Sequence, residues 1–298
     1  MKRTISIKGV YKMNWNELKS AYKETALRVI ERCRITVKSP GDPQRKYKLL
    51  VPSGDMKYPS FWVRDAAMTA ESGLIGVDEL HDWIEFICRY GQNGVEGRQL
   101  ENNLYIPPWA IPDHINYDGG SVFFPGTYES GINQGTGLCG YQPPHDDAFY
   151  FISMMYQFSL SSSKEMTISF LTTPLDGLSP LDRAMKAFDS SLTDIDTGLC
   201  RSVLPHYIVD WGFCDQITKS GLLLFPSLLK LRAAKHMEKM TKLCHYHEES
   251  ERFSAIAKNT KAFITEEFSS EEGWLLSSTG ICRQPDVWGT AFAIFIDA

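Results

Sequence analysis

Apolar residues recur at helical spacing along most of the chain. The clearest case is residues 15–33, where Trp15, Leu18 and Tyr22 begin a stripe that continues to Cys33. The same spacing predicts seven further helices, over residues 62–76, 78–91, 145–159, 180–191, 219–244, 248–268 and 286–297. Strand patterns are short and few, over residues 47–51 and 121–124. The pattern therefore predicts a mainly helical, all-α fold.

A long segment without helical periodicity separates the third and fourth predicted helices. Residues 94–144 contain nine glycines, and also seven aromatic residues, of which disordered segments usually have few. A loop of this length inside a compact domain is usually functional. We therefore expect an ordered aromatic wall over a binding site, formed by Tyr105, Trp109, Tyr117, Phe123, Phe124, Tyr128 and Tyr141.

The last predicted helix is strongly apolar. Residues 287–296 read VWGTAFAIFI, without a charged side chain. An apolar surface of this kind normally needs another element to cover it. We expect either that the helix docks as the last piece of the core or that the natural chain continues past Ala298.

Composition narrows the possible partners and the compartment. The 298 residues carry 31 basic and 36 acidic side chains, and the net charge of −5 gives no basic surface for nucleic acid or anionic lipid. No run approaches the ~18 apolar residues of a membrane span, and no apolar segment follows the basic residues 1–8 as in a signal peptide. Seven scattered cysteines indicate reduced thiols. We therefore expect one cytoplasmic domain over residues 1–298.

The start of the second predicted helix brings an indole, a guanidinium and a carboxylate together. Trp62, Arg64 and Asp65 lie within four residues of one another. This combination suits a sugar, because an indole covers the C–H face of a pyranose and the charged pair binds adjacent hydroxyls. The alternative is structural, with Asp65 stabilising the helix macrodipole and Arg64 pairing with a surface acid. The chemistry of the residues leaves both interpretations open.

The stretch FWVRDAA, residues 61–67, resembles the W-x-R-D-A signature of the six-hairpin, or (α/α)6, glycosidases, such as glucoamylases and debranching-type glucosidases. Three further stretches resemble later landmarks of that superfamily in the same order, QPPHDDAF (142–149), VDWGFCD (209–215) and QPDVWGTA (284–291). The resemblance implies an (α/α)6 toroid with its pocket at the N-terminal ends of the inner helices. It also implies hydrolysis of a terminal glycosidic bond, with inversion, in which Arg64 and Asp65 grip the terminal sugar. That chemistry requires no metal or organic cofactor.

Two adjacent carboxylates, Asp146 and Asp147, open the predicted helix over residues 145–159. One interpretation is a helix cap, which stabilises a helix by ~1 kcal/mol. The resemblance suggests instead that one of the two carboxylates lines the pocket and binds sugar hydroxyls. Both interpretations stay open.

The proton donor is expected within residues 209–215. Glycoside hydrolysis needs one carboxylic acid to protonate the leaving oxygen and a second carboxylate to activate water or to attack. Asp210 and Asp215 lie among apolar residues such as Trp211, an environment that raises a carboxyl pKa. Related enzymes usually carry Glu here, in a W-E-E-type run, and this chain has none. The acid is therefore left open between Asp210, Asp215 and neither of them, and Trp211 is expected to contact substrate.

The second carboxylate is expected late in the chain, as in glucoamylase-like relatives. Glu271 and Glu272 lie in a polar turn and are expected to be solvated. Asp286 precedes the last helix, where it either caps that helix or lines the pocket beside Trp288. The general base could also lie beyond residue 298. A complete ring of twelve helices needs on the order of 350–450 residues, so we expect an incomplete toroid, truncated at its C-terminal end.

Trp109, Asp113 and His114 in the long segment are further candidates for substrate contact, with turn chemistry as the alternative. No metal site is expected, because the Cys and His residues of 236–247 lack a second ligand group at suitable spacing.

Two other functions stay open from the sequence. Epimerases and isomerases of the same fold family transfer protons with histidine, which would be favoured if His114, His145 or His206 faced one another across the pocket. A non-catalytic carbohydrate-binding protein would be favoured if no second carboxylate lay near the acid. The sequence predicts no oligomeric state.

Overall fold

The computed structural model describes residues 14–55, 57–100, 105–124, 126–127, 142–205, 208–214 and 217–298. Within these ranges nine α-helices are present: α1 (Trp15–Cys33), α2 (Val63–Ala70), α3 (Val77–Phe86), α4 (Asp147–Ser161), α5 (Lys164–Thr172), α6 (Pro180–Asp189), α7 (Leu224–Leu243), α8 (His247–Phe268) and α9 (Val287–Ile296). A π-helical turn (Ile87–Gly91) continues α3, and a 3-10 turn (Gly212–Cys214) lies before α7.

The strands are short and serve mainly to hold loops together. They are β1 (Arg34–Lys38), β2 (Lys46–Leu50), β3 (Phe61–Trp62), β4 (Arg98–Gln99), β5 (Tyr105–Ile106), β6 (His114–Ile115), β7 (Ser121–Phe123), β8 (Gly126–Thr127), β9 (Arg201–Ser202) and β10 (Gly221–Leu222). β1 pairs with β2, β4 with β5 and β9 with β10, and one four-stranded sheet has the order β3-β6-β7-β8.

All eight helices expected from apolar spacing are confirmed, and α5 was missed. Its sequence, KEMTISFLT, is short and rich in β-branched residues, which weakens a helical signal. Ser163 caps it by accepting a hydrogen bond from the Met166 N–H at 3.2 Å. The helix expected over 219–244 begins at Leu224, because residues 221–222 pair as β10 with β9.

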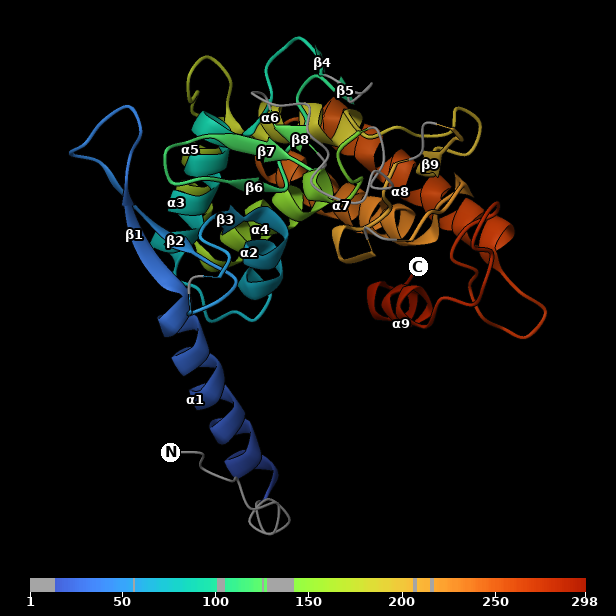
Figure 1. Ribbon diagram of the computed structural model, residues 1–298, viewed down its shortest axis with the longest axis horizontal. Coiled ribbons are helices and arrows are strands. Elements are labelled where there is room, and N and C mark those ends of the chain that lie inside the picture. The colour runs from blue at the N-terminus through green and yellow to red at the C-terminus, as the bar shows by residue number, and fades with distance from the viewer. Residues whose placement is uncertain are drawn as a thin grey trace.

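The helices pack as two layers around an arc. The inner layer runs α2, α4, α7, α9, since α4 packs against α2 and α7, and α7 packs against α9. The outer layer covers these contacts, with α3 and α6 against α4 and α8 along α7. Figure 1 shows this succession from teal α2 through green α4 to orange α7 and red α9. The described residues form an open arc, with α1 projecting from the body.

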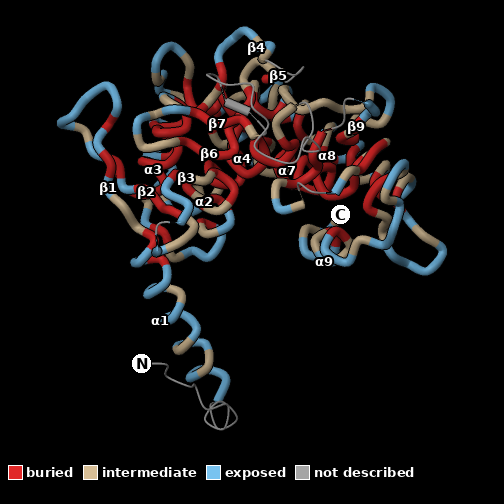
Figure 2. The backbone as a smooth tube through the Cα atoms, in the orientation of Figure 1, coloured by how far each residue is buried: buried red, intermediate tan, exposed pale blue. Residues whose placement is uncertain are grey.

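The core lies along α4 and α7, as the buried backbone in Figure 2 shows. Nine successive residues of α4, from Asp147 to Met155, are buried, and so are the first eleven of α7. An α-helix buried on every side must be surrounded by other elements, as an inner helix of a ring is. Each large apolar side chain buried there, such as Phe149 or Phe158, contributes roughly 1.5–3 kcal/mol.

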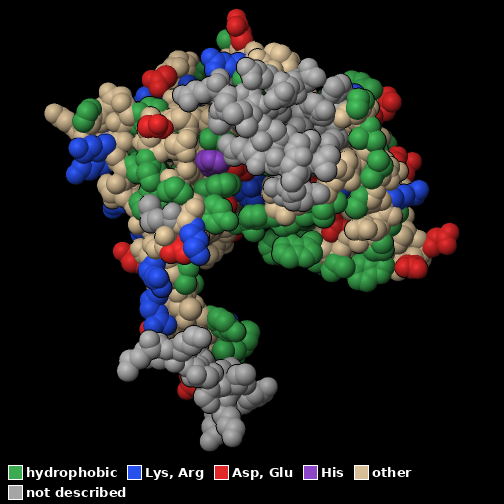
Figure 3. Space-filling model, in the orientation of Figure 1, with side chains coloured by type: hydrophobic (Ala, Val, Ile, Leu, Met, Phe, Trp, Pro, Cys, Tyr) green, Lys and Arg blue, Asp and Glu red, His purple; other side chains and the backbone are tan. Residues whose placement is uncertain are grey.

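The face of α9 that points away from the body is apolar and exposed. Only Gly289 and Ala293 of this helix are buried, whereas Trp288 is 67% and Phe295 77% exposed. Figure 3 shows apolar side chains gathered on the edge of the molecule where α9 lies. The helix therefore docks on α7 by one narrow stripe.

The expected aromatic wall over residues 94–144 is largely wrong for the part that the structure describes. Phe123 is buried in a small core with Ile106 and Ala110. Trp109 lies against α6, with the Lys186 ammonium 4.9 Å from its ring centre. Phe124 is the one described aromatic of the segment that lines the cavity introduced below. Tyr128 and Tyr141 lie outside the described residues.

The six described cysteines are free thiols, and four of them are buried. Within the described ranges, no helix combines the length and apolar character needed to cross a membrane.

Candidate functional site

Arg64 is the centre of a buried ionic network that joins three parts of the chain. Its Nε donates to Asp146 Oδ2 at 2.5 Å, its Nη1 to Asp113 at 3.1 Å and its Nη2 to Asp147 at 3.0 Å. The arginine is 2% exposed, and the three carboxylates are buried with it. The surface ion pair considered for Arg64 is therefore wrong.

Two inner helices and a strand pairing bring these residues together. Arg64 lies in the first turn of α2, and Asp146 and Asp147 lie at the start of α4. Pairing of β3 with β6 places Asp113 beside them, since the Val63 N–H donates to the Asp113 carbonyl at 3.1 Å. The positive ends of the two helix dipoles add to the Arg64 charge in stabilising these carboxylates.

The helix-cap interpretation of Asp146 and Asp147 is not what the structure shows. Asp146 occupies the N-cap position of α4, but its side chain makes no capping hydrogen bond. It accepts instead from Arg64 and, at 3.3 Å, from the Gly212 N–H. Both carboxylates therefore serve the Arg64 network.

Three carboxylates around one guanidinium carry more negative charge than the buried site can balance. Burial raises the pKa of Asp147 well above its ordinary value, against the Arg64 charge and with Asp146 and Asp113 adding to the rise. Burial also acts to raise the pKa of Asp113, but its hydrogen bond with His114 and the Arg64 charge hold that pKa below the ordinary value. Asp147 is therefore the member of the network whose neutral form burial favours.

A cavity of about 430 Å³ opens beside the network, and we call it the Trp62 cavity. This volume lies within the 300–1,000 Å³ of typical small-molecule sites. Asp65 reaches the cavity from α2, and burial raises the pKa of its carboxyl. The lining comprises Pro52, Tyr58, Trp62, Arg64, Asp65, Asp113, Phe124, Gly212 and Phe213.

Gly212 permits the close approach of the 3-10 turn to the network. A Cβ built on this residue would lie 2.1 Å from Arg64 Nη2, which no side chain could tolerate. The next residue, Phe213, places its ring 5.3 Å from the Arg64 guanidinium carbon. The 3-10 turn therefore packs against Arg64 with both the Gly212 backbone and the Phe213 ring.

We call a second cavity, of about 470 Å³, the Trp211 cavity. Phe213 lines both cavities, which makes them neighbours. Trp211 stacks on Phe225 with ring centres 4.5 Å apart and lies 5.6 Å from the Trp288 ring. The Trp211 cavity thus has aromatic walls formed by the third and fourth quoted sequence stretches.

Asp210 lies in the wall of the Trp211 cavity and is 1% exposed. Its Oδ2 accepts a hydrogen bond from Lys219 Nζ at 2.5 Å, whereas its Oδ1 has no partner among the described residues. Burial raises the pKa of Asp210, and the Lys219 charge opposes the rise. One oxygen of this carboxyl is thus held by Lys219, and the other is buried without a hydrogen-bond partner among the described residues.

Asp286 combines the two interpretations that the sequence left open. Its Oδ1 accepts from the Gly289 N–H at 2.7 Å and so caps α9. The same residue also lines the Trp211 cavity, together with Trp288. Glu271 and Glu272 are exposed, as expected from their polar turn.

The other predicted site residues do not all join this region. Trp109 packs on α6, and no described contact brings it to either cavity. Asp215 lies outside the described residues. His114 is buried beneath Trp62 and bonds Asp113, so it lies next to the Trp62 cavity without lining it.

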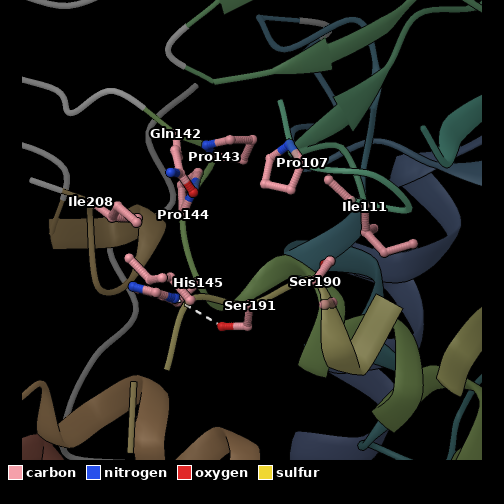
Figure 4. Close-up of a pocket in the computed structure, with 12 residues that line it drawn as sticks. Pro107, Ile111, Gln142, Pro143, Pro144, His145, Ser190, Ser191 and Ile208 are labelled. Carbon is pink, nitrogen blue, oxygen red and sulfur yellow. Dashed lines mark hydrogen bonds between the residues drawn. The ribbon is translucent and has the colours of Figure 1, made fainter. Parts of the chain in front are cut away.

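His145 faces away from both cavities, although it is adjacent to Asp146. Its Nδ1 lies 2.9 Å from Ser191 Oγ and its Nε2 lies 3.0 Å from the Arg201 carbonyl oxygen. Figure 4 shows the first of these bonds within a crevice of about 30 Å³. Burial lowers the pKa of His145 to about 4. Both ring nitrogens are occupied, and the residue is a structural part of the α4 start.

Sequence reasoning missed Lys219, Gly212, Phe213 and Tyr58. Gly212 and Phe213 lie inside the stretch quoted for its resemblance, between the two acid candidates, so position alone could have drawn attention to them. Lys219 lies in a polar stretch, Thr218–Ser220, that carries no pattern pointing to a buried ammonium.

The fold is similar to that of a glucoamylase from Saccharomycopsis fibuligera, with a TM-score of 0.53 and 12% identity, covering 90% of this chain and 53% of that chain. The chain thus has a fold of the (α/α)6 toroid type. It is also similar to a D-mannose isomerase, with a TM-score of 0.46 and 11% identity, covering 83% of this chain and 58% of that chain. No protein-family model matches the sequence, and no characterised protein matches it at the sequence level.

In a complete six-hairpin ring there are six inner helices, and the described residues provide four of them. The expected open ring is therefore confirmed for this part of the chain, which spans about half the length of the glucoamylase. The network and both cavities lie where the inner helices α2, α4, α7 and α9 begin. Among the described residues, no group of three or more His, Cys, Asp or Glu side chains is arranged to hold a metal ion.

Proposed function

We propose that this protein hydrolyses a terminal glycosidic bond of an oligo- or polysaccharide by carboxylate acid–base catalysis, with inversion. The observation that carries the proposal is the meeting of Trp62, Asp65 and Phe213 around one cavity beside the Arg64 network. A flat indole and a carboxylate in the lining of one cavity suit a ring that has an apolar face and hydroxyl edges.

In this proposal Trp62 and Asp65 hold the terminal sugar. Arg64 already donates hydrogen bonds to Asp113, Asp146 and Asp147. Its role in this proposal is therefore to hold these carboxylates in place around the cavity, and it does not bind the sugar by itself. Of these carboxylates, Asp113 also lines the cavity and can accept from a sugar hydroxyl.

The proton donor is assigned to residues 209–215, and Asp210 is the candidate whose surroundings support it. A general acid needs a raised pKa and an oxygen directed to the leaving group. Asp210 is buried, its pKa is raised, and its Oδ1 has no other partner among the described residues. Asp215 stays the second candidate. Asp286, in the wall of the same cavity, is the candidate for the second carboxylate.

The second sugar is expected in the Trp211 cavity, where Trp211 and Trp288 supply apolar rings. A substrate that crosses Phe213 would place the bond to be broken between the two cavities. Such a substrate has at least two sugar units, which a monosaccharide isomerase does not need.

The histidines give no support to an epimerase or isomerase. His145 has both ring nitrogens occupied, and His114 is enclosed between Trp62 and Asp113. His206 lies outside the described residues. Proton transfer by facing histidines therefore has no described pair to perform it.

The test is hydrolysis of a panel of aryl glycosides and disaccharides by the purified protein, with NMR of the first anomer released. Inversion is expected, and Asp210→Asn or Asp215→Asn should reduce kcat by at least ~10²-fold, as for loss of a general acid. Asp196→Asn is the matched control, because Asp196 is exposed in a turn and lines neither cavity. Unchanged hydrolysis in both acid variants contradicts the assignment, and interconversion of aldoses and ketoses without hydrolysis contradicts the reaction.

From the sequence we also propose that the protein binds a carbohydrate and is located in the cytoplasm. Fractionation of cells that express the full gene would test the location.

A further inference from the structure

We propose that His114 is a positioning residue for the Trp62 indole: Asp113 and the Arg64 network hold its ring, and it acts through Trp62 without touching the sugar. The inference rests on the proposed function, because Trp62 is there taken to stack on a sugar ring. It replaces the expectation from sequence that His114 contacts substrate directly.

The strand pairing places the two rings against each other. Trp62 is the last residue of β3 and His114 is the first of β6, and the two are directly opposite in the antiparallel register. Side chains that face each other in such a pair are within contact distance. The rings stack with centres 4.2 Å apart and planes inclined by 21°.

The imidazole is itself held in place by a buried carboxylate. His114 Nδ1 lies 2.8 Å from Asp113 Oδ2, and Asp113 Oδ1 accepts from Arg64 Nη1 at 3.1 Å. Asp113 therefore uses one oxygen for each partner. Since Asp146 and Asp147 fix Arg64 from α4, the orientation of the His114 ring is determined by residues from three separate parts of the chain.

The two faces of the indole have different surroundings. His114 covers one face, and Tyr58 meets the indole edge-on with ring centres 5.7 Å apart. Trp62 lines the cavity, whereas His114 does not. A sugar in the cavity can thus reach the indole but not the imidazole. An indole already fixed by His114 and Tyr58 loses little conformational entropy when a sugar binds. The smaller entropy loss makes the binding of the sugar tighter.

Three substitutions separate the stacking contact from the hydrogen bond. His114→Phe keeps a ring beneath Trp62 and loses the bond to Asp113. His114→Asn keeps a short polar side chain for Asp113 and loses the stack, and His114→Ala loses both. Emission of Trp62 is obtained in each background by subtracting the spectrum of the same variant carrying Trp62→Phe, and the thermal midpoint is measured beside it.

Binding is measured with maltose, isomaltose, cellobiose and mannobiose, and the tightest of these is used throughout. His114→Ala and His114→Asn are expected to shift the Trp62 emission and to weaken binding roughly threefold to tenfold, as for loss of an aromatic pair. His114→Phe should restore most of the affinity even where its thermal midpoint is lower. The inference is overturned if disaccharide affinity across the three variants correlates with their thermal midpoints and does not depend on whether residue 114 carries a ring.

A double-mutant cycle decides whether His114 acts through Trp62. In a Trp62→Ala background, His114→Ala should have no further effect on affinity, because the ring that it positions is gone. Two independent losses that multiply would show that His114 contacts the saccharide itself, against the inference. If Trp62→Ala abolishes binding while His114→Ala leaves it unchanged, the positioning role fails and the proposed function stands. If no disaccharide binding depends on Trp62, the proposed site itself fails.

Discussion

Replacing Asp147 by asparagine tests whether the Arg64 network holds a proton. The carboxyl of Asp147 is buried, its Oδ1 accepts from Arg64, and its Oδ2 has no partner among the described residues. An amide has nearly the shape of a protonated carboxyl and can accept from Arg64 in the same way. The substitution therefore removes a titration while keeping the packing and the bond to the guanidinium.

The sign of the effect follows from the raised pKa of Asp147. Above the ordinary pKa near 4, the unfolded chain releases this proton and the folded protein keeps it. The folded state then binds more protons than the unfolded state, so the free energy of unfolding falls as pH rises. The loss is about 1.4 kcal/mol per pH unit until the folded-state pKa is reached.

The assay is urea unfolding of the wild type and of Asp147→Asn at half-unit steps from pH 4 to pH 8. Subtracting the free energy of unfolding of the wild type from that of the variant at each pH removes the contributions of all other titrating groups. We expect this difference to be near zero at pH 4 and to move in favour of the variant by up to ~1.4 kcal/mol per unit as pH rises.

Asp146→Asn is the matched control, because Asp146 Oδ2 accepts from both Arg64 Nε and the Gly212 N–H. Breaking that buried pair should cost roughly 3–5 kcal/mol. A flat difference for Asp147→Asn, or a loss as large as that of Asp146→Asn, would refute the idea that Asp147 is neutral.

Three further predictions concern neighbouring residues. Gly212→Ala should lower the free energy of unfolding by roughly 1–3 kcal/mol, since its Cβ would meet Arg64, whereas Gly94→Ala, which has open space, should have little effect in the same urea titration. The lowered pKa of His145, about 4, makes unfolding easier as pH falls from 6.5, by about 3 kcal/mol at pH 4, and His145→Gln should remove that slope in urea titrations across this range. Lys219→Met should move the pH profile of hydrolysis to higher pH, because the charge that opposes the raised pKa of Asp210 is lost, and Lys219→Arg should restore it. A profile unchanged in Lys219→Met would contradict the role of that ion pair.

The sequence alone located most of the helices and the four stretches that carry the candidate site residues. Helical periodicity is a local property, so eight of the nine described helices could be located from apolar spacing, and α5 was lost only because it is short and β-branched. The quoted stretches also placed Trp62, Asp146 and Asp286 at the N-cap positions of α2, α4 and α9, where these inner helices begin.

Tertiary structure decided what these residues do to one another. Arg64 and Asp146 are 82 positions apart, and the pairing of Asp113 with both His114 and Arg64 depends on where β6 meets β3. No sequence pattern showed that Lys219 would be buried against Asp210, or that Trp109 would turn to α6. Spacing along a chain fixes which face of one helix a side chain occupies. Burial, ion pairing and the pKa shifts that follow depend on the neighbours that other helices bring, and only the packed ring supplies those.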